Sequence, residues 1–420
     1  MENNPLRLLI ADSKGKIFEH PFLEPAGMEA GNFSRLKPEE LLKIPAGSQL
    51  FRLPDRNPVG YDRVLNRFVI IDDAFAVAAF ASAGHTLTYN TAYSEKNTVK
   101  PLPLFSYGAC ASYKGNTYVA AMQVDKDKRH DTTLINIFQV KKNILKFKKL
   151  FPKNRLIRHL EICATVYGCP NAQNFFLSRY EAPLPTSPSC NAGCAGCISY
   201  QESKISCSQP RIKFVPSKEE IAEIAIFHIA HVKNPIVSFG QGCEGEPLLQ
   251  AKLIEDSIKI IRRKTGRGTI NLNTNGSKPE AVSKLIDAGL DTIRISLNSA
   301  RENYYSRYYN PRGYLFKDVI RSTKIAKEKN VFTSINYLTM PGFTDSRDEA
   351  AELIRLIETS GIGMIQWRNL NFDPMLYFKI LKIDDTKNIE PMGIRQEIYH
   401  LTKHFPNLRM GYFNPHKANR

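Results

Sequence analysis

The stretch Cys190-Asn-Ala-Gly-Cys194-Ala-Gly-Cys197 places three thiols within eight residues. Structural zinc sites use four ligands, commonly in two close pairs, and no clear fourth ligand follows this stretch. Three thiolates can instead hold three corners of a [4Fe–4S] cube and leave one iron open to a ligand. The small or turn-forming residues Asn191, Gly193 and Gly196 let a backbone fold closely around such a cluster. The alternative is a loop that contains three inert, buried thiols.

The Cys-x3-Cys-x2-Cys spacing resembles the cluster motif of the radical S-adenosylmethionine (SAM) superfamily. In that family three cysteines bind a [4Fe–4S] cluster, and the amino and carboxylate groups of SAM chelate the open iron. The resemblance implies that Cys190, Cys194 and Cys197 are the metal ligands and that SAM is the second cofactor. Many members have an aromatic residue just before the third cysteine, near the adenine, whereas this chain has Gly196.

Length and composition predict a globular protein of two to three domains, with 420 residues, 42% of them hydrophobic and 24% charged. The longest apolar run, residues 74–84, is too short to span a bilayer, so no membrane span is expected. Residues 1–6 lack the layout of a signal peptide. We therefore expect a cytoplasmic location, where thiols stay reduced. The net charge of +17 fits either an anion-binding surface or a solvated basic face.

Residues 1–150 are predicted to form a separate N-terminal α+β domain of unknown role. Short apolar or alternating stretches such as Leu6–Ile10 and Thr117–Val124 indicate strands, and recurrent proline and glycine favour turns over long helices. Residues 151–184 are interpreted as a basic linker leading into the next domain. The basic stretch Lys141–His159 contains interleaved apolar residues, which predicts an amphipathic segment with either an anion-binding or a merely solvated face.

Residues 185–372 alternate regularly between strand and helix patterns. Capping boxes at Ser217, Ser277 and Ser346 predict helix starts. Helix-length crossovers imply parallel strands. One strand before the cluster loop and five after it predict a partial (β/α)6 TIM-like barrel, an α/β fold whose site lies at the C-terminal strand ends. The five expected strands are residues 235–239, 269–274, 292–297, 332–338 and 364–370. Residues 373–420 are a predicted C-terminal extension with a helix near 394–404 and a short strand.

The first predicted strand after the cluster loop ends in Gly240-Gln-Gly-Cys-Glu-Gly245-Glu246-Pro247. Its Gly-Glu-Pro core resembles the family's Gly-Gly-Glu motif, which implies that Gly245 and Glu246 meet the ammonium group of SAM. An anionic Glu246 can pair with that cation in a site closed to water. Glu244 is close enough to be a rival for this role.

Later strand ends carry further candidate contacts to SAM. Asn273 and Asn275 are short polar residues suited to a ribose or carboxylate, and Ser296 and Asn298 share one face of their strand by alternation. The segment 336–342 resembles the family's strand-end motif that packs on adenine. The candidate cofactor contacts are therefore Gly245, Glu246, Asn273, Asn275, Ser296, Asn298, Met340, Gly342 and Arg368. Trp367 alternates to the opposite face and is expected in the core.

Four other cysteines, at irregular spacings, are Cys163, Cys169, Cys207 and Cys243. Since some relatives in the family bind auxiliary clusters, these residues either bind a second cluster or are ordinary buried thiols.

The resemblance implies an enzyme that cleaves SAM reductively and abstracts a hydrogen atom from an unidentified substrate, with an electron donor such as flavodoxin or ferredoxin. One alternative is an iron–sulfur electron-transfer or redox-sensing protein without SAM chemistry. Another is a nucleic-acid-binding module with a structural cluster, which the basic charge motivates. A small molecule or peptide is favoured over RNA as the substrate, because no stacking aromatic platform accompanies the basic stretch.

Overall fold

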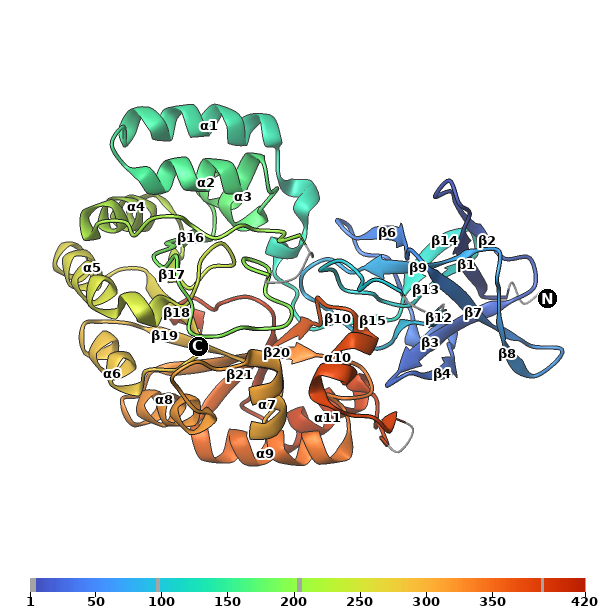
Figure 1. Cartoon of the computed structure of the whole chain (residues 1–420). Helices are drawn as coiled ribbons and strands as arrows, with labels where there is room; N and C mark the ends of the chain where they lie inside the picture. The colour runs from blue at the N-terminus through green and yellow to red at the C-terminus, as the bar shows by residue number, and fades with distance from the viewer. Residues whose placement is uncertain (1–4, 96–98, 202–205, 387–388, 420) are drawn as a thin grey trace.

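The computed structural model describes residues 5–95, 99–201, 206–386 and 389–419, which form a β-rich part beside a mixed α/β part (Figure 1). Residues 1–4, which include most of the N-terminal stretch examined for a signal peptide, lie outside the described residues. Within the described residues, no helix has the length and apolar character that a bilayer crossing requires.

The N-terminal part consists of short antiparallel strands in three sheets. Two-residue turns with positive φ close its hairpins, at Ala30-Gly31 and at Lys114-Gly115, as the twist of paired strands favours. The strands are β1 (Arg7–Ala11), β2 (Ile17–Glu19), β3 (Glu24–Glu29), β4 (Asn32–Arg35), β5 (Leu42–Lys43), β6 (Gln49–Arg52), β7 (Arg56–Asp62), β8 (Arg67–Ile70), β9 (Phe75–Phe80), β10 (His85–Leu87), β11 (Asn90–Thr91), β12 (Tyr93–Glu95), β13 (Cys110–Tyr113), β14 (Asn116–Val119) and β15 (Ala121–Gln123).

Residues 1–150, predicted to be an α+β domain, are β-rich and contain one α-helix among the described residues, at residues 137–150. Among the described residues only strands and short 3-10 turns precede Ile137, where the first α-helix begins. Here the chain pairs its backbone groups between short strands, with glycine or proline at many of the turns.

The segment expected to be a linker is instead helical and packed. Helices α1 (Ile137–Leu150), α2 (Arg155–Thr165) and α3 (Pro170–Phe176) lie beside α4 (Lys218–His231) (Figure 1). Phe147 of α1 has its ring centre 5.1 Å from that of Phe175 and 5.2 Å from that of Phe227. The lysines of α1 alternate with this apolar stripe, which is the amphipathic pattern that the sequence predicts.

The α/β part is built on one parallel sheet in the order β16-β17-β18-β19-β20-β21-β22. The six expected strands, one before the cluster loop and five after it, are all present, although the first, β16, lies within the range 151–184 expected to be a linker. A seventh, β22, is added by the C-terminal extension alongside β21. The strands are β16 (Glu181–Pro183), β17 (Ile236–Phe239), β18 (Thr269–Thr274), β19 (Thr292–Leu297), β20 (Phe332–Thr339), β21 (Ile362–Asn369) and β22 (Arg409–Gly411).

Helices follow the strands and cover one side of this sheet (Figure 1). Of the three predicted capping boxes, only Ser217–Glu220 forms, at the start of α4. The expected start at Ser277 is wrong, because Pro279 opens the helix and the Ser277 hydroxyl accepts a hydrogen bond from Asn191. Ser346 is an N-cap without a side-chain bond. The helices are α5 (Ala251–Lys264), α6 (Pro279–Asp287), α7 (Glu302–Tyr309), α8 (Phe316–Glu328), α9 (Arg347–Ser360), α10 (Pro374–Leu381) and α11 (Ile394–His404).

The two faces of the sheet differ in chemistry. Residues such as Ile295, Tyr337 and Trp367 are fully buried on the helix-covered face, in agreement with the expectation for Trp367. The other face is polar, where Arg294 donates to the Oε1 atom of Gln366 over 2.8 Å. The helices cover the apolar face of the sheet, whereas the polar face can meet polar ligands at the strand ends.

The C-terminal segment joins distant strands across the polar face. The Asn414 amide donates to Glu181 of β16 over 2.9 Å and accepts from Gln366 of β21 over 3.1 Å. Since β16 and β21 are the first and sixth strands of the sheet, this shared contact requires the sheet to be strongly curved.

The N-terminal part contacts the C-terminal ends of β20 and β21. Asn369, the last residue of β21, accepts a hydrogen bond from the backbone of Leu87 over 2.7 Å and donates to the carbonyl of His85 over 3.0 Å. Arg56 of β7 forms a buried ion pair of 3.1 Å with Asp373. The β-rich part therefore lies at the end of the sheet where a site is expected.

Candidate functional site

The cluster loop, residues 184–201, runs from the end of β16 toward α4 without regular structure. Its backbone is attached to the end of α7, because Gly193 donates to the carbonyl of Tyr309 over 2.9 Å and Ala195 donates to that of Tyr308 over 3.0 Å. Further along the chain, the amide of Arg312 donates to the carbonyl of Asn191 over 2.8 Å. These backbone bonds set the path of the loop independently of its side chains.

The three predicted ligand thiols lie close enough to influence one another. Burial, followed by the nearby Glu246 carboxylate, raises the pKa of Cys190 to about 11. Burial, followed by Cys197 and Cys190, raises the pKa of Cys194 well above its ordinary value. A coordinated metal cation reverses this preference and deprotonates such thiols. Three such thiols, in electrostatic contact with one another, fit a [4Fe–4S] cluster that keeps one iron open.

Cys197 has two polar neighbours that the sequence motifs did not indicate. The Arg211 guanidinium is 3.8 Å from its sulfur, and the Ser199 hydroxyl is 3.5 Å away. Hydrogen bonds and a positive charge next to a cluster thiolate stabilise its negative charge.

Gly196 departs from the resemblance for a steric reason. A Cβ atom at this position would lie 2.7 Å from the Tyr308 hydroxyl and 3.4 Å from Phe372. A larger side chain at position 196 would therefore meet Tyr308 of α7 and the Asn371 and Phe372 side chains after β21. The amide of Asn371 also donates to the carbonyl of Gly196 over 3.2 Å.

Glu246 is buried between two strand ends. One carboxylate oxygen accepts hydrogen bonds from the backbone of Leu248 over 2.9 Å and from the Thr274 hydroxyl. The other accepts only the backbone amide of Asn275, over 2.8 Å. Burial raises the pKa of Glu246 to about 7, although these hydrogen bonds oppose the shift. The carboxylate thus retains capacity for one more donor.

The hydrogen-bonding capacity of the Glu244 carboxylate is taken up by groups of the protein itself. Its two oxygens accept five hydrogen bonds, from the backbone and hydroxyl of Thr186 and from the backbone amides of Ser187, Gly240 and Gln241. Such a carboxylate fixes the loop that surrounds it and leaves little room for a ligand. Between the two acids, the geometry favours Glu246 as the one open to a ligand.

Asn275 connects Glu246 to the cluster loop. Its backbone binds Glu246, and its side-chain amide donates to the Oδ1 atom of Asn191 over 2.9 Å. Gly245 brings the same segments together, since its amide donates to Ser187 over 2.7 Å and a Cβ there would lie 1.9 Å from the carbonyl of Ser189. The structure therefore places Cys190, Gly245, Glu246 and Asn275 in one region.

The remaining polar candidates lie on or beside the polar face. Asn273 is buried and donates to the carbonyl of Phe239 over 3.0 Å. Ser296 is partly exposed, next to Asn336 in the sheet. Asn298 donates to the Tyr377 hydroxyl over 3.1 Å, and its buried Oδ1 atom has no hydrogen-bond partner within the part of the chain that the structure describes.

Three other candidates contact parts of the protein outside the cluster region. Met340 accepts from the Asn90 amide over 3.3 Å, and a Cβ at Gly342 would lie 2.3 Å from the backbone nitrogen of Ala30. Arg368 stacks on Tyr412, with its guanidinium carbon 3.6 Å from the ring centre. The first two contact the β-rich part and the third contacts the C-terminal segment, so the structure does not group them with the cysteines.

Comparison with known proteins identifies the class of domain that residues 184–354 form. Residues 184–354 match the family model described as the Radical SAM superfamily. This segment is therefore a radical SAM domain. The family defines a class of enzymes that use SAM and a [4Fe–4S] cluster, while the match leaves the subfamily unassigned.

Individual relatives are distant. The chain is 24% identical over 195 residues to the FeMo cofactor biosynthesis protein NifB of Klebsiella pneumoniae, which covers 42% of this chain and 40% of that protein. It is 26% identical over 165 residues to a probable GTP 3′,8-cyclase of Pyrobaculum aerophilum, covering 37% and 52%. The chain thus spans about half the length, or less, of these curated relatives.

Among solved structures, Streptococcus suis SuiB bound to the precursor peptide SuiA has 16% sequence identity and a TM-score of 0.40. The similarity covers 74% of this chain and 70% of SuiB. At this TM-score the similarity assigns no substrate to this chain.

Proposed function

We propose that this protein is a radical SAM enzyme that cleaves SAM reductively and abstracts a hydrogen atom from a substrate still to be identified. The observation that carries the proposal is the hydrogen-bonded chain from Glu246 through Asn275 to Asn191, which lies inside the three-cysteine motif. It joins a buried acid with one free acceptor site to the loop that supplies the thiols. When bound, the cluster and SAM supply one-electron cleavage and radical chemistry.

In this proposal Cys190, Cys194 and Cys197 hold the cluster, and Glu246 binds the ammonium group of SAM. Contact with a cation lowers the pKa of Glu246 from about 7, so the bound state has an ionised carboxylate. The unpaired Oδ1 atom of Asn298 is a further acceptor for a polar group of the ligand. Asn273 and Ser296 contribute to the same polar face.

The remaining parts of the chain are proposed to enclose the cluster and SAM. The curved sheet with its outer helices is proposed to be the partial (β/α)6-type barrel over residues 185–372, preceded by β16 at residues 181–183 and extended by β22 at residues 409–411. We propose that residues 1–150, which contact Met340 and Gly342, cover its mouth and contribute to substrate choice. Water exclusion by this cover protects reactive species from side reactions.

The substrate is proposed to be a small molecule or a peptide, and the electron donor a flavodoxin or ferredoxin. On α1 the Phe147 ring is buried and Phe138 is the one exposed ring beside the lysines, so no platform of several stacked rings for bases accompanies them.

The deciding experiment is anaerobic incubation of reconstituted, dithionite-reduced protein with SAM, followed by quantification of 5′-deoxyadenosine. We expect 5′-deoxyadenosine and methionine in the wild type and none in Cys194→Ala. A reduced protein that holds its full cluster but yields no 5′-deoxyadenosine and binds no SAM would support the electron-transfer or redox-sensing alternative instead.

A further inference from the structure

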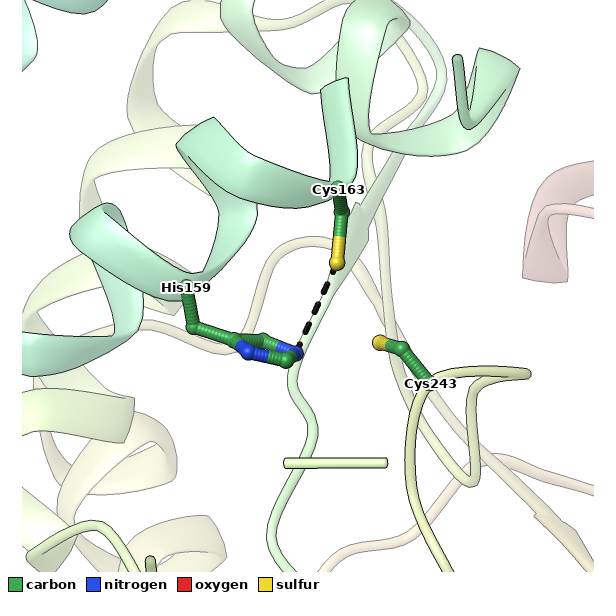
Figure 2. Close-up of side chains that lie close together, drawn as sticks. All are labelled: His159, Cys163 and Cys243. Atoms are coloured by element: carbon green, nitrogen blue, oxygen red, sulfur yellow. Dashed lines mark hydrogen bonds between the residues drawn. The ribbon is translucent and has the colours of Figure 1, made fainter. Parts of the chain in front are cut away.

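A second group of metal-binding side chains lies away from the cluster loop. His159 and Cys163 are one turn apart on α2, and Cys243 lies in the loop that follows β17 (Figure 2). Their possible ligand atoms all lie within 4.8 Å of one another. His159 Nε2 is 3.5 Å from the Cys163 sulfur. Cys163 and Cys243 are 1% and 3% exposed, so solvent does not compete for this position.

Cys169 lies next to this group. Its backbone amide donates to the carbonyl of Cys163 over 2.9 Å, which brings the start of α3 onto the end of α2. Its side chain lines a cavity of about 20 Å³ together with Cys163 and Cys243. A space of this size holds a single small species rather than a four-iron cube. Cys207 stands apart, since its thiol interacts with Cys197 and Arg211 instead.

The spacing of the ligand atoms suits one tetrahedral ion. With zinc–sulfur bonds of about 2.3 Å and zinc–nitrogen bonds of about 2.0 Å, two tetrahedral sulfur ligands lie about 3.8 Å apart and a sulfur and a nitrogen about 3.5 Å apart. The observed 3.5 Å between nitrogen and sulfur agrees with this geometry. A cube would require the cysteine sulfurs to reach separate irons, and the compact group would have to open.

We propose that His159, Cys163, Cys169 and Cys243 bind one zinc-type divalent ion. Three cysteines and one histidine are a ligand set typical of structural zinc. Ion binding displaces the thiol protons and involves no electron transfer.

The ion would join three segments that are far apart in the sequence. It would attach the loop after β17 to α2 and α3, and this loop also contains Glu244 and Glu246. If the function proposed above is correct, the ion thereby helps to position the SAM-binding carboxylate. The metal site itself does not depend on that function.

The first test is elemental analysis of the full-length protein, purified without chelators after expression in zinc-supplemented medium. We expect about one zinc per chain, both in the wild type and in Cys194→Ala, which removes the iron cluster. Zinc should fall to background in Cys163→Ser and Cys243→Ser. It should be unchanged in the matched controls Cys110→Ser, at another buried thiol, and Cys207→Ser, at a thiol outside the group.

A second measurement avoids dependence on the folding of the variants. Chelator-treated, full-length Cys194→Ala protein titrated with Co²⁺ should develop the intense visible absorption of tetrahedral, thiolate-bound cobalt, saturating at one equivalent. Absence of zinc and of this cobalt spectrum would overturn the proposal. So would a second iron–sulfur cluster, with about eight irons per chain, or a Cys163–Cys243 disulfide in protein isolated without zinc. None of these readouts depends on SAM cleavage.

Discussion

At the scale of single residues, two acids two positions apart illustrate how environment separates roles. Glu244 accepts five hydrogen bonds from its own loops, whereas one oxygen of Glu246 accepts only the backbone amide of Asn275. Both carboxylates are buried, so an unpaired charge on either is costly. A cationic ligand relieves that cost at Glu246, where an acceptor position is free.

Glu246→Gln is expected to keep the cluster and to weaken SAM binding, because a neutral amide cannot pair with an ammonium group. A charge-assisted hydrogen bond of this kind is worth about 1.5–3 kcal/mol, so the dissociation constant should rise about ten- to a hundredfold. Isothermal titration calorimetry of reconstituted protein would measure it. Unchanged affinity in Glu246→Gln together with a loss in Glu244→Gln would reverse the assignment of the two acids.

The cluster ligands are tested by composition. Anaerobically reconstituted protein should contain about four irons and four sulfides per chain. Alanine at Cys190, Cys194 or Cys197 should remove the brown chromophore, and Cys110→Ala should retain it because Cys110 is buried in the β-rich part and donates to the carbonyl of Val77. Retention of a full cluster by Cys194→Ala would rule out this ligand set.

At the scale of elements, the site depends on how closely loops approach one another. The cluster loop meets the end of α7 on one side and the loop after β17 on the other through backbone hydrogen bonds. At Gly245 the second approach leaves no space for a Cβ, which would lie 1.9 Å from the carbonyl of Ser189. Backbone atoms cannot move aside as the end of a side chain can, so this glycine sets the distance between Glu246 and the cysteines.

Gly245→Ala is therefore expected to push the two loops apart, lower stability by about 1–3 kcal/mol and reduce iron incorporation. Chemical denaturation and iron analysis would measure both effects. Gly266→Ala is the matched control, since nothing lies within 4 Å of a Cβ there and its φ is not positive. Equal behaviour of the two variants would contradict the steric argument.

At the scale of the whole molecule, buried acids lie between the β-rich part and the α/β part. Glu29, at the end of β3, has its pKa raised to about 8 by burial and then by Asp345 and Glu40. Burial raises the pKa of Asp345, in the loop after β20, to about 6. Glu397 of α11 has a pKa well above its ordinary value, because of burial and the nearby Asp345 and Glu349. Because each pKa is raised on folding, the folded state favours the protonated carboxyl group more than the unfolded state does.

A carboxyl group whose pKa is raised on folding adds stability that is fully present below its unfolded pKa of about 4.5 and is lost as pH rises through its folded pKa of about 8. The Glu29 contribution to the free energy of unfolding should therefore fall from about pH 4.5 to about pH 8, and part of this fall lies between pH 6.5 and pH 8.5. Glu29→Gln should show a shallower fall, which urea denaturation at both pH values would measure. An identical slope in wild type and variant would show that Glu29 is ionised at neutral pH.

Local sequence patterns determined the cluster motif, the alternation of strands and helices after residue 185, and the acid-containing loop after β17. These features depend on short-range spacing and on the period of apolar residues, both of which can be read from the sequence alone. The amphipathic character of α1 and the burial of Trp367 followed from the same periodicity.

Only the tertiary structure decided which residues meet across the chain. It brought Tyr308 against Gly196, Asn414 between β16 and β21, and His159 next to Cys243. It also placed Met340 and Gly342 against the β-rich part, where the family motif alone implied a cofactor contact. Such contacts depend on the curvature of the sheet and on the docking of distant segments, for which neighbouring residues in the sequence provide no signal.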